Sequence, residues 1–218
     1  MTVSDDRRTA VDFTVPFMTF GSEILMKKPL EANDGSTQVP PLPTISSIRD
    51  LAGQTVIKYG VIKDGRTADF FRKSPDPDYK QMWDEMSKNP NYGTVPSTEV
   101  GVEMVRKADG RYAFITEGTT ADYWVHQKPC DLVSVKGKMD TRQYALAVRR
   151  GNSELKAKID EALTQMKDDG ELDQLHRKWW IEKSECGGAT SFISTGSLVI
   201  VLPTALMALA FPLLYGSP

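Results

Sequence analysis

Patterns typical of helices and of strands alternate along most of this 218-residue chain, and this alternation limits the folds open to it. The apolar run at residues 112–115 is typical of a short buried strand. From Leu155 to Met166, apolar residues recur at helical spacing instead. We expect Ser153 to cap that helix and Gly170 to end it. Such alternation predicts an α/β fold with a mixed sheet.

The remaining segments follow the same alternation. Extended segments broken at Pro16 and Gly21 are expected within residues 11–27, and further strands at 55–59 and 144–148. Helices are expected at residues 46–53, 67–73, 75–88, 97–107 and 172–180. In the helix at 97–107, we expect Val100 and Val105 to face inward.

The overall charge is nearly balanced, with 27 basic and 29 acidic residues and a net charge of −2. This balance predicts no nucleic-acid partner. The sequence contains no nucleophile elbow, Walker loop, dinucleotide fingerprint or pair of catalytic carboxylates. His126 and His176 lack the spacing of metal ligands. We therefore expect no enzyme activity, no metal and no cofactor.

The end of the chain differs in composition, because residues 187–218 contain no Asp, Glu, Lys or Arg. A helix over residues 192–215 would be about 36 Å long, enough to cross the hydrocarbon core of a bilayer. The alternative is a GPI-attachment signal, since small residues at 187–189 precede a polar spacer and a hydrophobic end. The polar start of the chain lacks the apolar run of a secretory leader, which indicates a fragment or an incomplete gene.

The chain has two cysteines, Cys130 and Cys186. Composition alone leaves two interpretations open, a disulfide or two unrelated buried thiols. If the cysteines are paired, the bond closes a long loop and contributes about 4 kcal/mol in the chain-entropy model.

Four stretches of the sequence resemble the ligand-binding segments of ionotropic glutamate receptors. In these receptors a Thr, and an Arg five residues later, bind an amino acid's carboxylate just before a D-F-[ST]-x-P-F signature. Residues 1–29 show this pattern as Thr2 and Arg7, followed by Asp12, Phe13, Thr14, Pro16 and Phe17. The start, the ligand-contacting middle and the end of the receptors' second segment are similar to residues 44–74, 111–131 and 172–187.

The resemblance implies a two-lobed, periplasmic-binding-protein-like clamshell with an incomplete upper lobe, followed by one transmembrane helix. Residues 1–29 would end the first ligand-binding segment and residues 44–187 would form the second. The polar linker at 30–43 stands where the receptors have their pore helices. Residues 192–215 would be the last membrane helix. The lobe crossings are expected near residues 20–28 and 137–148.

The resemblance also implies a site for a free amino acid. Arg7 would bind the α-carboxylate through its planar guanidinium, and Thr2 would add a contact beside it. Glu117 would pair with the ammonium group. Thr67, at a helix N-terminus, would receive a distal carboxylate. Arg66 departs from the small residue of the glutamate receptors, and would add a cation for an acidic ligand, bridge the lobes or crowd the pocket.

The resemblance also implies a disulfide, a ligand, partner subunits and a cellular location. The family's disulfide implies a bond between Cys130 and Cys186, beside which the adjacent Trp179 and Trp180 are expected to pack. The implied ligand is glutamate first and glycine second. The receptor would be a tetrameric ligand-gated cation channel in the plasma membrane, with this region extracellular and facing the synapse in a postsynaptic cell. The alternative function is a pore-less amino-acid-binding protein tethered to the membrane.

Overall fold

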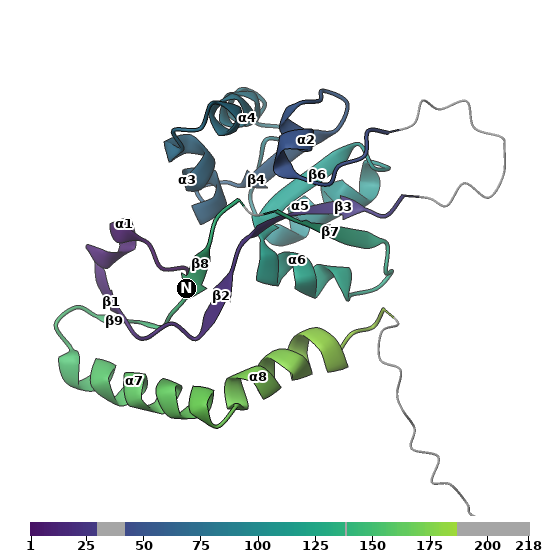
Figure 1. Cartoon of the computed structure of the whole chain (residues 1–218). Helices are drawn as coiled ribbons and strands as arrows, with labels where there is room; N and C mark the ends of the chain where they lie inside the picture. The colour runs from purple at the N-terminus through teal and green to yellow at the C-terminus, as the bar shows by residue number, and fades with distance from the viewer. Residues whose placement is uncertain (30–41, 138, 187–218) are drawn as a thin grey trace, which may run out of the picture.

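The computed structural model describes residues 1–29, 42–137 and 139–186 (Figure 1). A five-stranded sheet with helices on both faces forms one lobe, and two short strand pairs form the rest of the clamshell. Almost all of the predicted linker at 30–43 and the predicted membrane helix at 192–215 lie outside the described residues. Within the described ranges, no helix is both long and apolar enough to span a bilayer.

The large lobe is built on a mixed sheet with the strand order β5-β4-β6-β3-β7. β4 runs parallel to both β5 and β6, whereas β3 runs antiparallel to β6 and β7. The predicted mixed α/β sheet is therefore confirmed. Its strands are β3 Ser22–Lys27, β4 Lys58–Ile62, β5 Thr94–Val95, β6 Tyr112–Glu117 and β7 Leu132–Lys136.

Side-chain alternation along β3 explains why helices cover both faces of the sheet. Ile24 belongs to the apolar cluster on one face, and its neighbour Leu25 belongs to the cluster on the other. Phe71, Met82 and Met86 pack with Ile24. The helices of that first face are α2 Ile48–Ala52, α3 Arg66–Lys73 and α4 Pro77–Lys88. The second face is covered by α5 Thr98–Lys107 and α6 Gly118–Val125.

The buried side of α5 differs from the prediction at one residue. Val105 is fully buried as expected, but Val100 is 36% exposed and Val102 takes its place in the core. Gly101 sets this orientation, because a Cβ there would come within 2.8 Å of the Phe114 ring. The helix therefore packs closely against β6 through Gly101, which the apolar spacing alone did not reveal.

The smaller part of the clamshell consists of two antiparallel strand pairs, and the chain continues from β2 into β3 of the large lobe. β1 Val11–Phe13 pairs with β9 Ala147–Arg149, and β2 Met18–Phe20 pairs with β8 Arg142–Tyr144. The single strand predicted at 144–148 is thus two strands with different partners. The strand predicted at 55–59 starts later, at Lys58, because the Gln54 side chain hydrogen-bonds to both the N–H and the C=O of Ile57 and holds that residue in a loop.

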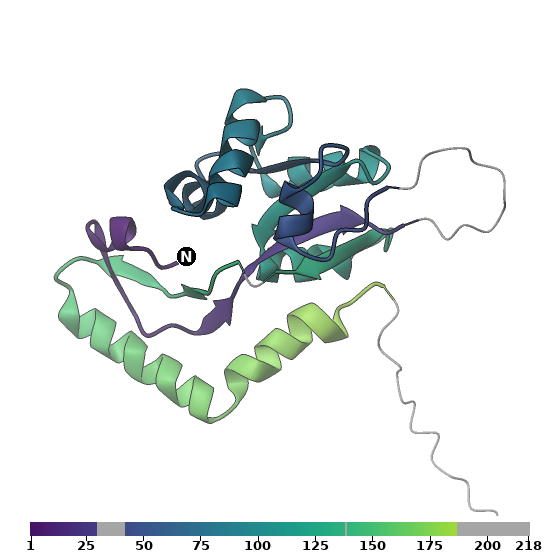
Figure 2. The same ribbon diagram turned by 45° about the horizontal axis from the view of Figure 1, so that its top comes forward.

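The C-terminal arm runs along one side of the molecule (Figures 1 and 2). It comprises α7 Ser153–Asp168, α8 Glu171–His176 and the π-helical turn η1 Arg177–Glu182. Asn152, rather than the predicted Ser153, caps α7 by accepting the N–H of Leu155. Gly170 separates α7 from α8 in a left-handed conformation with φ 74°. No residue of the three helices is fully buried, so packing holds this arm weakly.

A disulfide joins Cys130 to Cys186, which confirms the predicted pairing. The bond attaches the end of the arm to the loop between α6 and β7. Next to it, the Trp180 indole donates to the carbonyl of Thr119 at 2.8 Å, as expected of a packing residue. Trp179 instead remains 47% exposed beneath Lys183, so only one of the two tryptophans packs as predicted.

The β3 residue Glu23 makes the stability of the lobe depend on pH. Its side chain is 8% exposed and accepts a hydrogen bond from Ser134, and burial is the main cause that raises the pKa of Glu23 above its ordinary value of 4.5. The native state therefore holds this proton more tightly than the unfolded state, and the chain loses stability as the pH rises above 4.5 through the folded pKa.

Replacing Glu23 by Gln is expected to remove that loss. Urea unfolding at pH 4 and pH 7 should show the free energy of unfolding of Glu23→Gln rising relative to wild type as the pH increases. Glu99→Gln is the control with the opposite sign, because hydrogen bonds from the Ser97 side chain and from its own backbone N–H lower the pKa of the exposed Glu99. Parallel pH profiles of wild type and Glu23→Gln would contradict the assignment.

Candidate functional site

The first residues of the chain are anchored between the lobes. Thr2 forms a β-bridge with Tyr144 and is only 5% exposed. The amino group of Met1 donates to the carbonyl of Ala145 at 2.8 Å, and the N–H of Ala145 donates back to the Met1 carbonyl at 3.1 Å. Thr2 is therefore held in a defined position next to the strand β8.

A cluster around Glu117 joins three segments that are far apart in the sequence. The Thr2 hydroxyl donates to Glu117 Oε1 at 2.6 Å, and the Tyr144 hydroxyl donates to Oε2. Thr119 Oγ1 lies 3.0 Å from the Tyr144 hydroxyl. Glu117 reaches this place because it is the last residue of β6 and directly precedes α6. The predicted pair Thr2 and Glu117 is thus in direct contact.

Arg7 lies on the other side of Thr2. It belongs to the short helix α1 Asp5–Arg8, which Ser4 caps by accepting the N–H of Arg7. The Arg7 guanidinium donates from Nη1 to the Thr2 carbonyl at 2.7 Å. Thr2 therefore connects the Arg7 cation to the Glu117 anion. A pair of opposite charges suits a ligand that carries a carboxylate and an ammonium group.

Tyr144 was not predicted as a site residue. Its ring packs against Phe20 with centroids 4.2 Å apart. Burial, with a further contribution from the Glu117 carboxylate, raises the pKa of Tyr144 well above its usual value. The phenol therefore stays protonated at neutral pH and acts as a hydrogen-bond donor to Glu117.

Thr67 and Arg66 lie at the start of α3, in the large lobe. Gly65 precedes them and offers no side chain to cap the helix, so the N-terminal N–H groups receive no side-chain cap. Thr67 is buried, and its Oγ1 accepts a hydrogen bond from Arg142 Nη1 at 3.2 Å. Arg66 points toward Asp69, with 3.8 Å between the charged atoms.

Sequence reasoning also missed Arg142. The pattern that points to it is the two-residue spacing from Tyr144, because residues two apart on a strand face the same side of it. Arg142 lines a cavity of about 260 Å³ together with residues of α3 and of the chain's start. The lining comprises Val3, Arg66, Phe70, Asp140, Thr141, Arg142 and Gln143.

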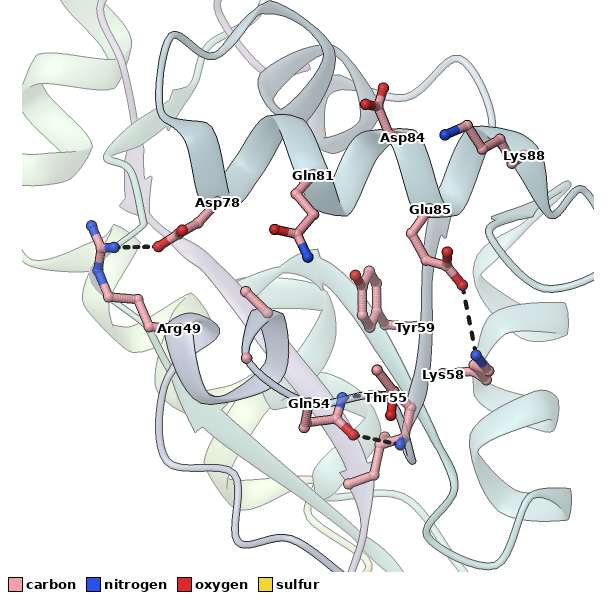
Figure 3. Close-up of a pocket in the computed structure, with 13 residues that line it drawn as sticks. Arg49, Gln54, Thr55, Lys58, Tyr59, Asp78, Gln81, Asp84, Glu85 and Lys88 are labelled. Atoms are coloured by element: carbon pink, nitrogen blue, oxygen red, sulfur yellow. Dashed lines mark hydrogen bonds and ion pairs between the residues drawn. The ribbon is translucent and has the colours of Figure 1, made fainter.

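A larger cavity of about 600 Å³ lies elsewhere, between α2, the start of β4 and one side of α4 (Figure 3). None of the five predicted ligand residues lines it. Its charged side chains largely pair with one another, as Arg49 does with Asp78 and Lys58 with Glu85. Size alone therefore does not identify the functional site. No group of three or more potential metal ligands occurs in the described part of the chain.

Comparison with known proteins identifies the fold family. The family model of bacterial extracellular solute-binding proteins, family 3, matches residues 1–182. The chain belongs to this family. Membership confirms the predicted periplasmic-binding-protein-like α/β fold, because the match includes both the strand pairs and the five-stranded sheet.

Curated relatives of this chain include glutamate receptors. Mouse glutamate receptor 3 is 40% identical over 148 residues, which are 67% of this chain and 16% of the relative. Human glutamate receptor 3 is 41% identical over 144 residues, 66% of this chain and 16% of the relative. The chain thus covers about a sixth of the length of these receptors.

A solved structure agrees with these relatives. A Drosophila muscle GluRIIB complex with glutamate matches with a TM-score of 0.70 and 31% identity, over 83% of this chain and 66% of that one. The predicted resemblance is confirmed. The described chain is a ligand-binding region of the ionotropic glutamate receptor type.

Proposed function

We propose that this chain binds L-glutamate between its lobes, with Arg7 on the α-carboxylate, Glu117 on the ammonium group and the start of α3 on the distal carboxylate. The observation that carries this proposal is the contact of both Arg7 and Glu117 with Thr2, at 2.7 and 2.6 Å. Both charged groups are half-buried, and a zwitterion supplies an opposite charge for each of them.

The third contact concerns the ligand's side chain. The N-terminus of α3 carries a partial positive charge and N–H groups without a side-chain cap. Thr67 and Arg66 add a hydroxyl and a cation there. Glutamate fits this set better than glycine, because glycine has no group that reaches α3. Binding would use no covalent chemistry.

The role of the bound ligand follows from the two-lobed architecture. The ligand would favour the closed arrangement of the lobes, and closure would act on pore helices of a cation channel. We also propose that the apolar residues 192–215 form a membrane helix, that the ligand-binding region lies outside the cell at the plasma membrane, and that such subunits assemble as a tetramer.

Radiolabelled L-glutamate tests the binding site directly. The full-length chain in detergent is expected to bind it saturably, and unlabelled glutamate should displace the label at lower concentration than glycine does. Saturable binding of glycine with no displacement by glutamate would reverse the assigned ligand. No displaceable binding of either amino acid would contradict the proposed function.

Tyr144→Phe is expected to weaken glutamate binding about tenfold. A hydrogen bond to a charged group is worth about 1.5 kcal/mol, and the variant removes one of the two donors that orient Glu117 while keeping the ring on Phe20. Isothermal titration calorimetry measures the change. Tyr123→Phe, at an exposed tyrosine of α6, is the matched control and should bind as wild type. Equal affinities for Tyr144→Phe and wild type would exclude the phenol from the site.

A further inference from the structure

Arg142 is the first residue of the strand β8. Its Cα pairs with Phe20 of β2, where the chain passes from the small strand pairs to the large sheet. Two residues later on the same strand, Tyr144 contacts Glu117. One short strand therefore presents Arg142 toward the α3 end of the cleft and Tyr144 toward the Glu117 end.

The contacts of Arg142 leave one of its hydrogen-bond donors without a partner among the described residues. The side chain is only 7% exposed, its Nε pairs with Asp140 and its Nη1 donates to Thr67. Nη2 is buried and has no hydrogen-bond partner among the described residues. The face of the guanidinium lies over Phe70, with Cζ 5.7 Å from the ring centroid. A buried N–H group without an acceptor is unfavourable, so this end of the cleft favours a ligand group that accepts a hydrogen bond, and a carboxylate is the stronger acceptor.

The charged residues that line the cavity besides Arg142 are Asp140 and Arg66. Asp140 also accepts the N–H of Ser22 at 2.8 Å, so its negative charge is shared between two strands. The cavity beside Arg142 is lined by a second cation, Arg66, whose charge is offset by Asp69 at 3.8 Å. No other carboxylate than Asp140 lines this cavity among the described residues.

We propose that Arg142 is a positioning residue that makes the cleft selective for acidic over uncharged amino acids by acting through Thr67. This inference rests on the proposed function. Because Thr67 Oγ1 accepts from Arg142, its own hydroxyl hydrogen is directed away from the guanidinium and toward the ligand's distal group. The polarised hydroxyl, the α3 N-terminus and the buried cation then favour a carboxylate over a neutral amide.

The geometry of β8 supports this class of ligand. Residues two apart on a strand are about 6.5 Å apart, and both point to the same side. Arg142 contacts Thr67 and Tyr144 contacts Glu117, so this strand orients the two groups that are proposed to hold the two ends of the ligand.

The test compares glutamate with glutamine, which has the same shape without the distal charge. Isothermal titration calorimetry on the full-length chain should show Arg142→Gln binding glutamate at least tenfold more weakly than wild type, with glutamine affinity changed less than threefold. Arg142→Lys keeps the charge and should restore most of the glutamate preference. Lys63→Gln, outside the cavity lining, is the control and should leave the ratio unchanged.

A second set of variants keeps the test decisive if Arg142→Gln does not fold. Thr67→Val removes the acceptor of Arg142, whereas Thr67→Ser keeps it. Thr67→Val should therefore lose the glutamate preference although Arg142 is unchanged, whereas Thr67→Ser should keep it.

The outcomes separate the two proposals. Equal weakening of glutamate and glutamine in Arg142→Gln, or an unchanged preference in Thr67→Val, overturns the role of Arg142 and leaves amino-acid binding intact. A wild-type chain that binds neither amino acid overturns the proposed function and this inference together. Loss confined to glutamate, with recovery in Arg142→Lys, supports the inference.

Discussion

Arg7→Lys is expected to weaken glutamate binding about 100-fold. The planar guanidinium donates two parallel hydrogen bonds to a carboxylate, and an ammonium group does not reproduce that geometry. Losing charge-assisted hydrogen bonds costs about 3 kcal/mol, which corresponds to two decades in affinity. The variant also disturbs the contact from Arg7 to the Thr2 carbonyl, which connects the cation to Glu117. Calorimetry or displacement of labelled glutamate measures the effect.

The adjacent arginine is the matched control. Arg8 is exposed and lies over the Phe13 ring, with its Cζ 5.7 Å from the centroid. Arg8→Lys changes the same residue type one position away and should leave affinity within about twofold of wild type, as expected of an exposed substitution. A similar loss in both variants would show that the whole helix α1, rather than Arg7, supports binding. Wild-type affinity in Arg7→Lys would remove Arg7 from the site.

Replacing both cysteines by serine is expected to lower the free energy of unfolding by about 4 kcal/mol. The bond joins residues 56 apart, and closing a loop of that length restricts the unfolded chain by this amount in the entropy model. Denaturant unfolding of wild type and of Cys130→Ser/Cys186→Ser measures the difference. Adding a reductant should lower the stability of wild type and leave the double variant unchanged, which makes the variant its own control.

The disulfide should matter most for the C-terminal arm. None of the residues of α7, α8 or η1 is fully buried, so the arm depends on Cys186, on the Trp180 hydrogen bond and on a few backbone contacts. Hydrogen exchange in the double variant should increase over residues 171–186 before it increases in the central strands β3 and β6. Uniform loss of protection across the sheet would contradict this local role.

Much of the fold was predictable because it depends on local patterns. The helix predicted at 67–73 and the apolar strand before Glu117 appear as predicted, since apolar spacing acts over a few neighbours. The predictions that were wrong depend on contacts between residues far apart in the sequence. Val100 is exposed because Gly101 packs on Phe114. The strand predicted at 144–148 divides because its two halves pair with β2 and β1.

Part of the candidate site could likewise be predicted from the sequence, and part could not. The motif predicted Thr2, Arg7 and Glu117, and the structure brings these three into one network although 115 residues separate Thr2 from Glu117. Thr67 appears at the predicted helix start. Arg142 was not identified in this way, because it lies outside the four stretches that carry the resemblance.

The sequence by itself determined the family, the mixed α/β architecture and the pair of cysteines, because motifs, apolar periodicity and residue types are readable without a fold. Only the tertiary structure decided which polar groups are buried and what they contact. Burial raises the pKa of Tyr144, and one buried nitrogen of Arg142 has no hydrogen-bond partner among the described residues. These properties arise from desolvation and distance, and both are set by elements that meet only when the chain folds.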